Sequence, residues 1–280
     1  MKLRITLMIF AFLGQIFSGA SQTRVVKNID YAGTSLSTNT LNIYHNKGSA
    51  KNQDVIVFIH GGSWSSGKKE TYWWLGRNLA KKNIVTAVIN YPLAPAATYK
   101  EMAQASAKAV SWVKDSIAAY GGNPNRIFLM GHSAGGHLCE LINADPTYFK
   151  AEKIDPPIKG VILNDAFGLD MEEYLTKAEK DGSYSDFLRT FSADPEQWQT
   201  GSPLFYVKNV KNPHLVFYGS KTYPAIQLQS ERIYSVLKAQ NTPVRLEVIE
   251  GKKHVGMISQ MIFGSNKLYQ SILSFLSETK

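Results

Sequence analysis

The stretch Gly-His-Ser-Ala-Gly-Gly-His at residues 131–137 decides the fold predicted for this chain. It follows the apolar run Ile-Phe-Leu-Met at residues 127–130 and precedes a segment with a helical pattern, so a strand, a sharp turn and a helix meet at Ser133. A glycine two residues to either side of the serine lets strand and helix pass closely, because glycine has no Cβ. Ser133 is therefore the candidate nucleophile.

Three motifs in a fixed order resemble those of one enzyme group. Residues 122–137 resemble the nucleophile region of α/β-hydrolase-fold serine esterases, the group that includes hormone-sensitive-lipase-like, feruloyl-esterase-like and kynurenine-formamidase-like enzymes. His-Gly-Gly-Ser-Trp at residues 60–64 resembles the oxyanion loop of that group, and Tyr-Pro-Leu-Ala-Pro at residues 91–95 resembles its Tyr-x-Leu-Ala-Pro turn. The resemblance covers roughly residues 25–280 and implies an α/β-hydrolase fold and hydrolysis of carboxylic esters.

Apolar runs alternate with helical patterns along the chain. Continuous runs, typical of strands buried on both faces of a parallel sheet, lie at residues 54–60, 84–89, 127–130, 160–164, 214–218 and 244–249. Alternating patterns on both sides of a turn predict an antiparallel N-terminal hairpin at residues 24–30 and 39–45. Helices are predicted at residues 70–81, 101–120, 134–144, 225–239 and from Met257 to the end. The expected fold is α/β, with a mostly parallel sheet and helices on both faces.

The first twenty residues predict a secretory leader. A basic start is followed by an apolar run at residues 5–17 and by the small residues Ser-Gly-Ala at 18–20. The run is shorter than the 18 or more residues, roughly, of a spanning helix, so we expect cleavage after Ala20, export to the periplasm or beyond, and no membrane anchor afterwards. Residues 21–280 are then expected to form one domain, with an insertion over the strand ends at about residues 167–212.

The charge pattern limits the classes of binding partner that we expect. The chain has 31 basic and 22 acidic residues, a net charge of +9, and its lysines occur as dispersed pairs. A nucleic-acid site would need clustered basic residues interleaved with aromatics, so we expect no nucleic-acid partner, while weak attraction to acidic polysaccharide or anionic lipid headgroups stays open. The single cysteine, Cys139, cannot form an intramolecular disulfide and is expected to be buried. The oligomeric state is not predicted.

A nucleophilic serine needs a base within hydrogen-bond reach. His254 follows the last predicted strand, where this fold presents its base. His60 and His132 lie in the oxyanion loop and the elbow and are expected to brace them. No two histidines have the spacing, with a nearby carboxylate, that a zinc site needs, so we expect no metal and no cofactor.

The loop after the first buried strand supplies the remaining predicted site residues. A tetrahedral intermediate carries negative charge on the former carbonyl oxygen, which backbone N–H groups can stabilise. We assign Gly61, Gly62 and Ala134 as these donors, the last because it follows the nucleophile. Trp64 and Phe167 are predicted to line a largely apolar substrate pocket.

The triad acid departs from the pattern of the group. Those enzymes carry Asp or Glu in a Gly-x-x-Asp-x-Pro pattern after the next-to-last strand, whereas residues 219–224 read Gly-Ser-Lys-Thr-Tyr-Pro, with Thr222 at the acid's position. Asp165 ends the strand after the elbow strand, and strand carboxyl ends face the crevice of such sheets, so Asp165 is the predicted replacement. Asp170 and Glu250 are alternatives, and a capping or turn role for Asp165 stays open.

These residues lead to one expected function and two alternatives. The expected function is an exported serine hydrolase that cleaves carboxylic esters, small or linked to carbohydrate, through an acyl-enzyme intermediate. One alternative is an amidase of the aryl-formamidase type. The other is a catalytically impaired relative that binds a ligand or partner through the same pocket. The missing acid favours the binding protein, whereas Ser133, His254 and the oxyanion glycines oppose it.

Overall fold

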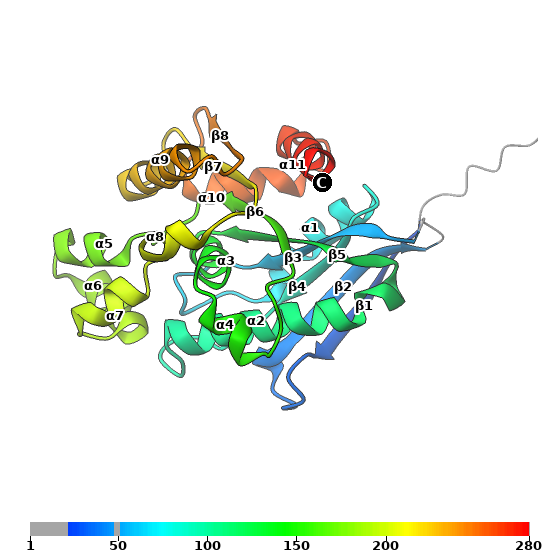
Figure 1. Cartoon of the computed structure of the whole chain (residues 1–280), viewed down its shortest axis with the longest axis horizontal. Coiled ribbons are helices and arrows are strands. Elements are labelled where there is room, and N and C mark those ends of the chain that lie inside the picture. The colour runs from blue at the N-terminus through cyan, green and yellow to red at the C-terminus, as the bar shows by residue number, and fades with distance from the viewer. Residues whose placement is uncertain (1–21, 48–50, 280) are drawn as a thin grey trace, which may run out of the picture.

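The structure, a computed structural model, describes residues 22–47 and 51–279. Its described residues build one eight-stranded sheet in the order β1-β2-β4-β3-β5-β6-β7-β8 (Figure 1). The strands are β1 (Gln22–Asp30), β2 (Thr40–Lys47), β3 (Gln53–Ile59), β4 (Val85–Ile89), β5 (Gly122–His132), β6 (Ile158–Asn164), β7 (His214–Gly219) and β8 (Val244–Ile249).

The sheet is parallel from β4 to β8 and antiparallel at its N-terminal edge. β1 pairs antiparallel with β2, and β2 pairs antiparallel with β4. Every other neighbouring pair is parallel. The fold class expected from the sequence is confirmed, including the opening hairpin. In the middle of the sheet, β3 and β6 flank the elbow strand β5, so the carboxyl ends of these three strands meet at one edge.

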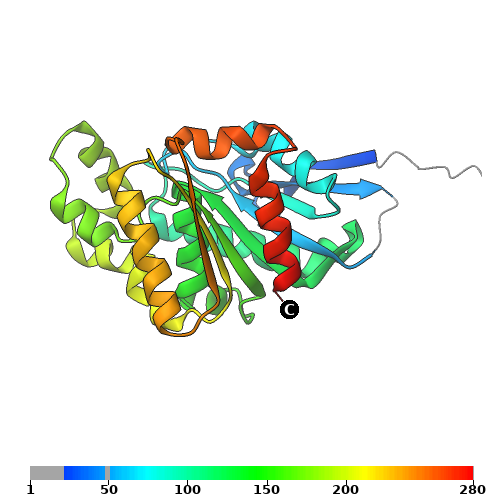
Figure 2. The same cartoon turned by 90° about the horizontal axis from the view of Figure 1, so that it is seen from above.

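Helices cover both faces of the sheet (Figure 2). They are α1 (Trp73–Ala80), α2 (Tyr99–Ser116), α3 (Ala134–Ala144), α4 (Thr147–Ala151), α5 (Met171–Lys177), α6 (Gly182–Phe191), α7 (Pro195–Thr200), α8 (Pro203–Tyr206), α9 (Pro224–Ala239), α10 (His254–Ser259) and α11 (Lys267–Glu278). One apolar cluster joins the sheet to α2, α3 and α9, and the other joins it to α1, α10 and α11.

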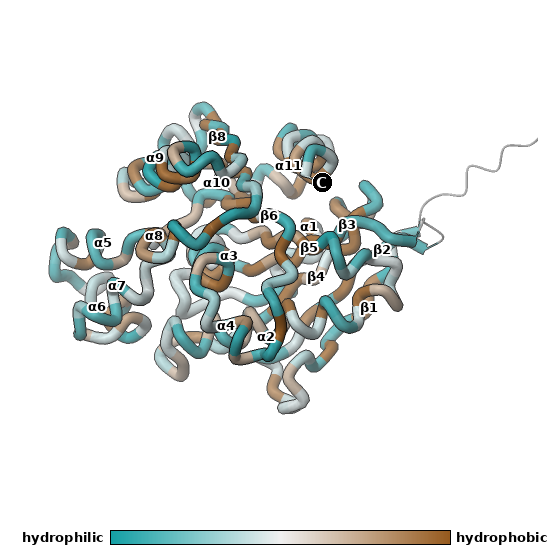
Figure 3. Tube along the Cα trace, viewed as in Figure 1, coloured by the Kyte–Doolittle hydropathy of each residue, from teal (hydrophilic) through white to brown (hydrophobic). Residues whose placement is uncertain are grey.

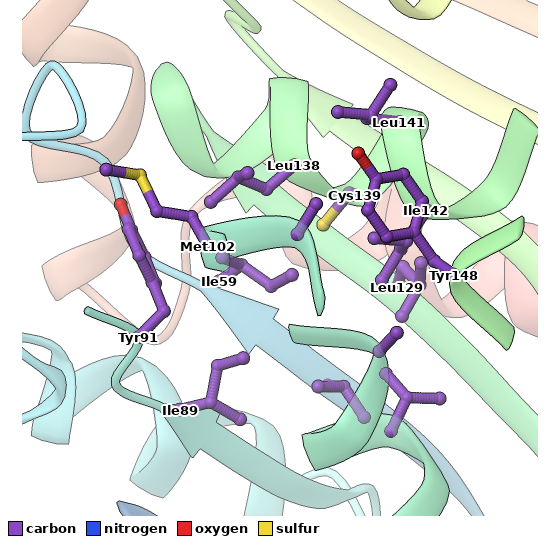
Figure 4. Close-up of a cluster of buried hydrophobic side chains, with 14 of the residues drawn as sticks. Ile59, Ile89, Tyr91, Met102, Leu129, Leu138, Cys139, Leu141, Ile142 and Tyr148 are labelled. Carbon is purple, nitrogen blue, oxygen red and sulfur yellow. The ribbon is translucent and has the colours of Figure 1, made fainter. Parts of the chain in front are cut away.

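Alternation along the buried strands divides side chains between these clusters. Successive strand residues point to opposite faces, so Ile59 and Leu129 pack beneath α3, whereas Phe58 and Phe128 pack toward α1 and α11. Figure 4 shows Ile59 and Leu129 with Leu138 of α3 in the first cluster. Hydrophobic residues are concentrated in these central strands (Figure 3). Burial on both faces explains why the strands read as continuous apolar runs.

An all-helical segment lies between β6 and β7. It contains α5 to α8, and α5, α6 and α7 gather at one end of the molecule, beyond the carboxyl end of the sheet (Figure 1). The capping residue of α5 is Asp170, whose side chain accepts a hydrogen bond from the Glu173 N–H. This segment corresponds to the insertion expected at about residues 167–212.

The helix predicted from Met257 to the end is wrong in its extent. A helical run begins at His254 and passes through α10 into the short 3₁₀ helix η5 (Gln260–Ile262). Phe263 then has an extended backbone, and α11 begins only after Asn266, whose side chain accepts from the Leu268 N–H. The extended backbone at Phe263 ends the first helical run, and the Asn266 N-cap starts the second.

The predicted leader at residues 1–20 lies outside the described residues. Among the helices that are described, none has the length and apolarity needed to span a membrane.

Candidate active site

Ser133 occupies the sharp turn between β5 and α3. Its φ of 55° and ψ of −126° place it in a conformation that L-residues rarely adopt. The two motif glycines make the turn possible: a Cβ on Gly131 would lie 2.2 Å from the Gly135 carbonyl oxygen, and a Cβ on Gly135 would lie 2.0 Å from the Ile59 carbonyl oxygen. Both contacts are far below van der Waals distance. The close passage of strand and helix inferred from the motif is therefore confirmed.

Three side chains from distant parts of the chain form one hydrogen-bonded series. His254 Nε2 lies 2.8 Å from Ser133 Oγ, and His254 Nδ1 lies 2.6 Å from Asp165 Oδ2. With a proton on Nδ1, the imidazole donates to the carboxylate and presents the Nε2 lone pair to the serine hydroxyl. The series begins after β5, passes through the first residue of α10 and ends after β6. The His254 imidazole is therefore placed to take the proton of Ser133, with Asp165 as its orienting partner.

Asp165 is fully buried and held by further donors. The Gly219 N–H donates to Oδ1 over 2.9 Å, and the Thr222 hydroxyl donates to Oδ2, the oxygen that also accepts from His254. The Asp165 N–H bonds the Phe217 carbonyl oxygen of β7 at 2.8 Å, and its φ is 53°. The residue at the family's acid position thus contacts the carboxylate that reaches His254.

The alternative acids lie elsewhere. Asp170 caps α5 with one carboxylate oxygen and receives the Arg232 guanidinium on the other, at 2.8 Å. Glu250 is exposed in the turn after β8. Neither makes a hydrogen bond with His254 in the described part of the chain.

Two buried histidines support the site without joining the series. The His132 ring stacks on the His254 ring with centroids 4.8 Å apart, and its Nε2 lies 3.2 Å from the His254 carbonyl oxygen. His60 donates from Nδ1 to the Gly61 carbonyl oxygen over 2.9 Å, which braces the oxyanion loop. Burial lowers the pKa of each, to about 4, so both rings are neutral near pH 7. A neutral His132 places no positive charge beside the base.

The oxyanion loop is a tight turn against the elbow. A Cβ on Gly61 would lie 2.8 Å from the His132 carbonyl oxygen, and Gly62, with φ of 127°, has the Ser66 carbonyl oxygen 2.2 Å from its Cβ position. Among the described residues, no acceptor takes the N–H of Gly62, Ser63 or Ala134. Ser63 lines the cavity, a place that the sequence analysis did not give it. The oxyanion roles of Gly61, Gly62 and Ala134 stay predictions.

A cavity of about 510 Å³ opens at Ser133 and His254. Four aromatic residues, Phe167, Tyr174, Phe187 and Tyr223, stand in its wall, which also includes Ser63, Ser183, Pro224 and Ala225. Phe167 was predicted there. The other three have no sequence signal for this place: Tyr174 and Phe187 belong to the insertion, which has no motif, and Tyr223 lies in a segment whose family pattern marks only the acid's position. Other hollows of similar size contain no part of the hydrogen-bonded series.

Trp64 does not line this cavity, contrary to the prediction. Its side chain is fully buried, packing edge-on against Phe191 with ring centroids 4.9 Å apart. The indole N–H needs an acceptor once buried and donates to His137 Nδ1 over 3.2 Å, while His137 Nε2 donates to the Gly201 carbonyl oxygen over 2.7 Å. Trp64 therefore ties the oxyanion loop to α3 and the insertion.

Comparisons with known proteins agree with this arrangement. The BD-FAE family model matches residues 41–237. A probable isoprenylcysteine alpha-carbonyl methylesterase of Arabidopsis thaliana is 28% identical over 95% of this chain and 66% of its own length. A kynurenine formamidase of Salmo salar is 24% identical over 87% of this chain and 84% of its own length. The chain spans only 59% to 66% of the length of the first two Arabidopsis methylesterases that it matches.

Solved structures share the fold at low sequence identity. Esterase B from Lactobacillus rhamnosis has a TM-score of 0.77 at 18% identity, with 92% of this chain and 86% of that chain covered. A truncated carbohydrate esterase from gut microbiota has a TM-score of 0.77 at 19% identity, with 91% and 96% covered. Because the family model spans most of the chain, and the fold and elbow agree with it, this chain belongs to the BD-FAE family of α/β-hydrolase-fold serine esterases.

Proposed function

We propose that this protein hydrolyses carboxylic esters through an acyl-enzyme intermediate. The observation that carries the proposal is the unbroken series from Ser133 and His254, which line the aromatic cavity, to the buried Asp165. A nucleophile, its base and the partner that orients the base are the parts that acyl transfer requires.

The geometry supports the following course. Ser133 Oγ attacks the ester carbonyl carbon while its proton moves to His254 Nε2. The tetrahedral intermediate collapses, and the departing alcohol takes that proton from His254. A water molecule then attacks the acyl-serine, giving a proton to His254, and collapse of the second intermediate releases the carboxylic acid and returns the proton to Ser133.

Asp165 acts in this course by holding the imidazole. Its carboxylate keeps the proton on Nδ1, so that the Nε2 lone pair faces the serine, and it stabilises the imidazolium formed at each attack. Complete burial of the carboxylate, with the Gly219 N–H as a fixed donor, keeps this orientation. Asp165 thus supplies the function that an acid at position 222 has in the resembling enzymes.

Backbone N–H groups are proposed to stabilise the two tetrahedral oxyanions. Gly61, Gly62 and Ala134 are the donors assigned from the sequence, and the unpaired N–H of Ser63 in the cavity wall makes it a further candidate. Each such donor lowers the barrier by roughly 3 kcal/mol when it is aimed at the developing charge.

The cavity favours esters with an apolar or aromatic part. The rings of Phe167 and Tyr174 meet edge-on with centroids 4.8 Å apart, and Phe187 stands 5.6 Å from Phe167. Flat groups fit beside such rings, whereas the open mouth leaves room for a longer alcohol, including one linked to carbohydrate.

An aryl-formamidase activity is the second candidate. The similarity to a fish kynurenine formamidase over 84% of that enzyme's length supports it, since the same series could attack a formyl amide. A purely binding role would explain the threonine at position 222, but the contact of Asp165 with His254 argues against it.

Export is also proposed. The basic start, the apolar run at residues 5–17 and the small residues before Ser21 support removal of a leader and a mature chain in the periplasm or outside the cell.

A substrate panel tests the activity. Wild type and Ser133→Ala are assayed with p-nitrophenyl acetate, longer alkyl esters, a methyl hydroxycinnamate and N-formylkynurenine. We expect ester turnover by the wild type and none by the variant, with matching circular dichroism. Turnover confined to the formyl amide would favour the second candidate, and turnover of esters that survives in Ser133→Ala would contradict the mechanism.

A further inference from the structure

Large apolar side chains are exposed along one side of the helical run that begins at His254. Val255 is 69% exposed, and Phe263, just past the end of η5, is 71% exposed. Val255 and Ile262 are seven residues apart in this run and therefore lie on the same side of it. Tyr223 is also exposed, and its ring lies 5.2 Å from the His254 ring. We call Tyr223, Val255, Ile262 and Phe263 the α10 ridge.

The ridge is held in place from behind. Met257 and Met261 on the opposite side of the run are fully buried in the apolar cluster that also contains α1 and α11. Asn78 of α1 donates to the carbonyl oxygens of Met261 and Ile262 over 3.2 and 3.1 Å. The run lies at the outer margin of the molecule, in orange-red along the upper edge of Figure 2. Packing and hydrogen bonds therefore fix the ridge with its apolar side chains toward solvent.

Lysines are the commonest charged residues beside the ridge in the sequence, where the exposed Glu250 is the nearest acidic residue. Residues 213–230 and 251–277, which contain the ridge, include no Asp or Glu. They include Lys221, Lys252, Lys253 and Lys267, and the first two are neighbours, because the Lys221 N–H donates to the Lys252 carbonyl oxygen over 3.0 Å. The lysines flank the ridge in the sequence, with Lys253 before Val255 and Lys267 after Phe263.

We propose that the α10 ridge docks on the surface of a bilayer that contains anionic phospholipids. Aliphatic and aromatic side chains of this kind enter the boundary between headgroups and acyl chains, and flanking lysines meet the negative headgroups. Because His254 begins the same run, docking would place the cavity mouth beside the lipid surface. The inference goes beyond ester hydrolysis, since it names where the protein binds and is measurable without turnover.

Two other occupants fit the ridge less well. A second copy of the chain, related by a two-fold axis, would bring the same four lysines of each copy together, with Glu250 as the nearest carboxylate in the sequence. An acidic polysaccharide would attract the lysines and could stack on Tyr223 or Phe263, but it would leave the aliphatic groups of Val255 and Ile262 without a use. A lipid surface uses both features.

Vesicle flotation tests the proposal with the chain that begins at Ser21, which contains every described element of the fold. Vesicles of phosphatidylcholine alone are compared with vesicles that also contain phosphatidylglycerol, at low and high salt. We expect binding only to the anionic vesicles, weakened by salt. Phe263→Ser should weaken binding about tenfold and Lys267→Gln about fivefold.

A matched pair of variants provides the control. Phe205 is 50% exposed on α8, and its neighbours Leu204 and Tyr206 pack on the face of the sheet that α3 covers, whereas α10 packs on the opposite face. Phe205→Ser and Lys208→Gln should therefore leave vesicle binding unchanged. The proposal would be overturned by equal losses of binding in both pairs of variants, or by binding to neutral vesicles that does not depend on salt. It would also be overturned by ridge-dependent dimers in size-exclusion chromatography, or by ridge-dependent binding to polygalacturonate in place of vesicles. Hydrolysis of p-nitrophenyl acetate without vesicles is measured for every variant, so that loss of docking is distinguished from failure of the proposed esterase.

Discussion

Replacing Thr222 by valine removes one donor from the carboxylate that orients His254. The Thr222 hydroxyl and the His254 imidazole both donate to Asp165 Oδ2, whereas the Gly219 N–H holds Oδ1. A hydrogen bond to a charged group contributes about 1.5–3 kcal/mol, equivalent to a factor of about 10 to 150 in rate if it were all expressed in the transition state. Since the Gly219 donor remains, we expect Thr222→Val to lower kcat about tenfold with KM unchanged.

A double-mutant cycle separates this role from a general loss of structure. Asp165→Asn should lower kcat by about 10⁴-fold, as losing the orienting acid does in other triads. If the hydroxyl acts through the carboxylate, Thr222→Val should have almost no further effect in the Asp165→Asn background. Thr222→Ser keeps the donor and should retain nearly all activity. The reasoning would be refuted by equal losses from Thr222→Val in both backgrounds, or by a Thr222→Ser variant as slow as Thr222→Val.

Three more outcomes are expected. In an ester-turnover assay, the double variant Asp165→Asn/Thr222→Asp should have a kcat about tenfold above that of Asp165→Asn. The reason is that Thr222 already contacts the Asp165 oxygen that accepts from His254, so an acid at position 222 can reach the imidazole. An unchanged kcat would show that residue 222 cannot reach the imidazole. Burial lowers the pKa of His60 and His132 to about 4. Between about pH 6.5 and pH 4 the unfolded chain therefore binds protons that the folded chain does not. The free energy of unfolding should fall as the pH drops through this range, by up to about 3 kcal/mol per histidine. Urea titrations across that range test this, and a flat profile would contradict it. N-terminal sequencing of the naturally produced protein should begin near Ser21, and an intact Met1 on a cytoplasmic protein would refute export.

The sequence predicted the sheet and the elbow well because their signals are local. Continuous apolar runs marked strands buried on both faces, and the predicted bounds of β8 and α3 agree with the structure. The C-terminal helix was wrong because its apolar period continues across the break at Phe263, where the Asn266 cap, a side-chain hydrogen bond, starts a new helix.

The site was predictable only where a motif fixes position. Ser133 and His254 follow from the order of elements, and Asp165 followed from its place at a strand end. The contact of Thr222 with Asp165 joins residues 57 positions apart and left no local signal. Trp64 was misplaced for the same reason: its neighbour His137 and the helical insertion, which have no shared sequence pattern with it, bury its ring.

Labelling with a fluorophosphonate, followed by peptide mass spectrometry, tests the central claim most directly. Such a reagent phosphonylates a serine only when a neighbouring base activates the hydroxyl. We predict a single adduct on Ser133 of the folded wild type, prevented by heat denaturation and absent from Ser133→Ala and His254→Ala. A folded wild-type protein that stays unlabelled, or that is labelled equally in His254→Ala, would contradict the assignment of Ser133 as a nucleophile activated by His254.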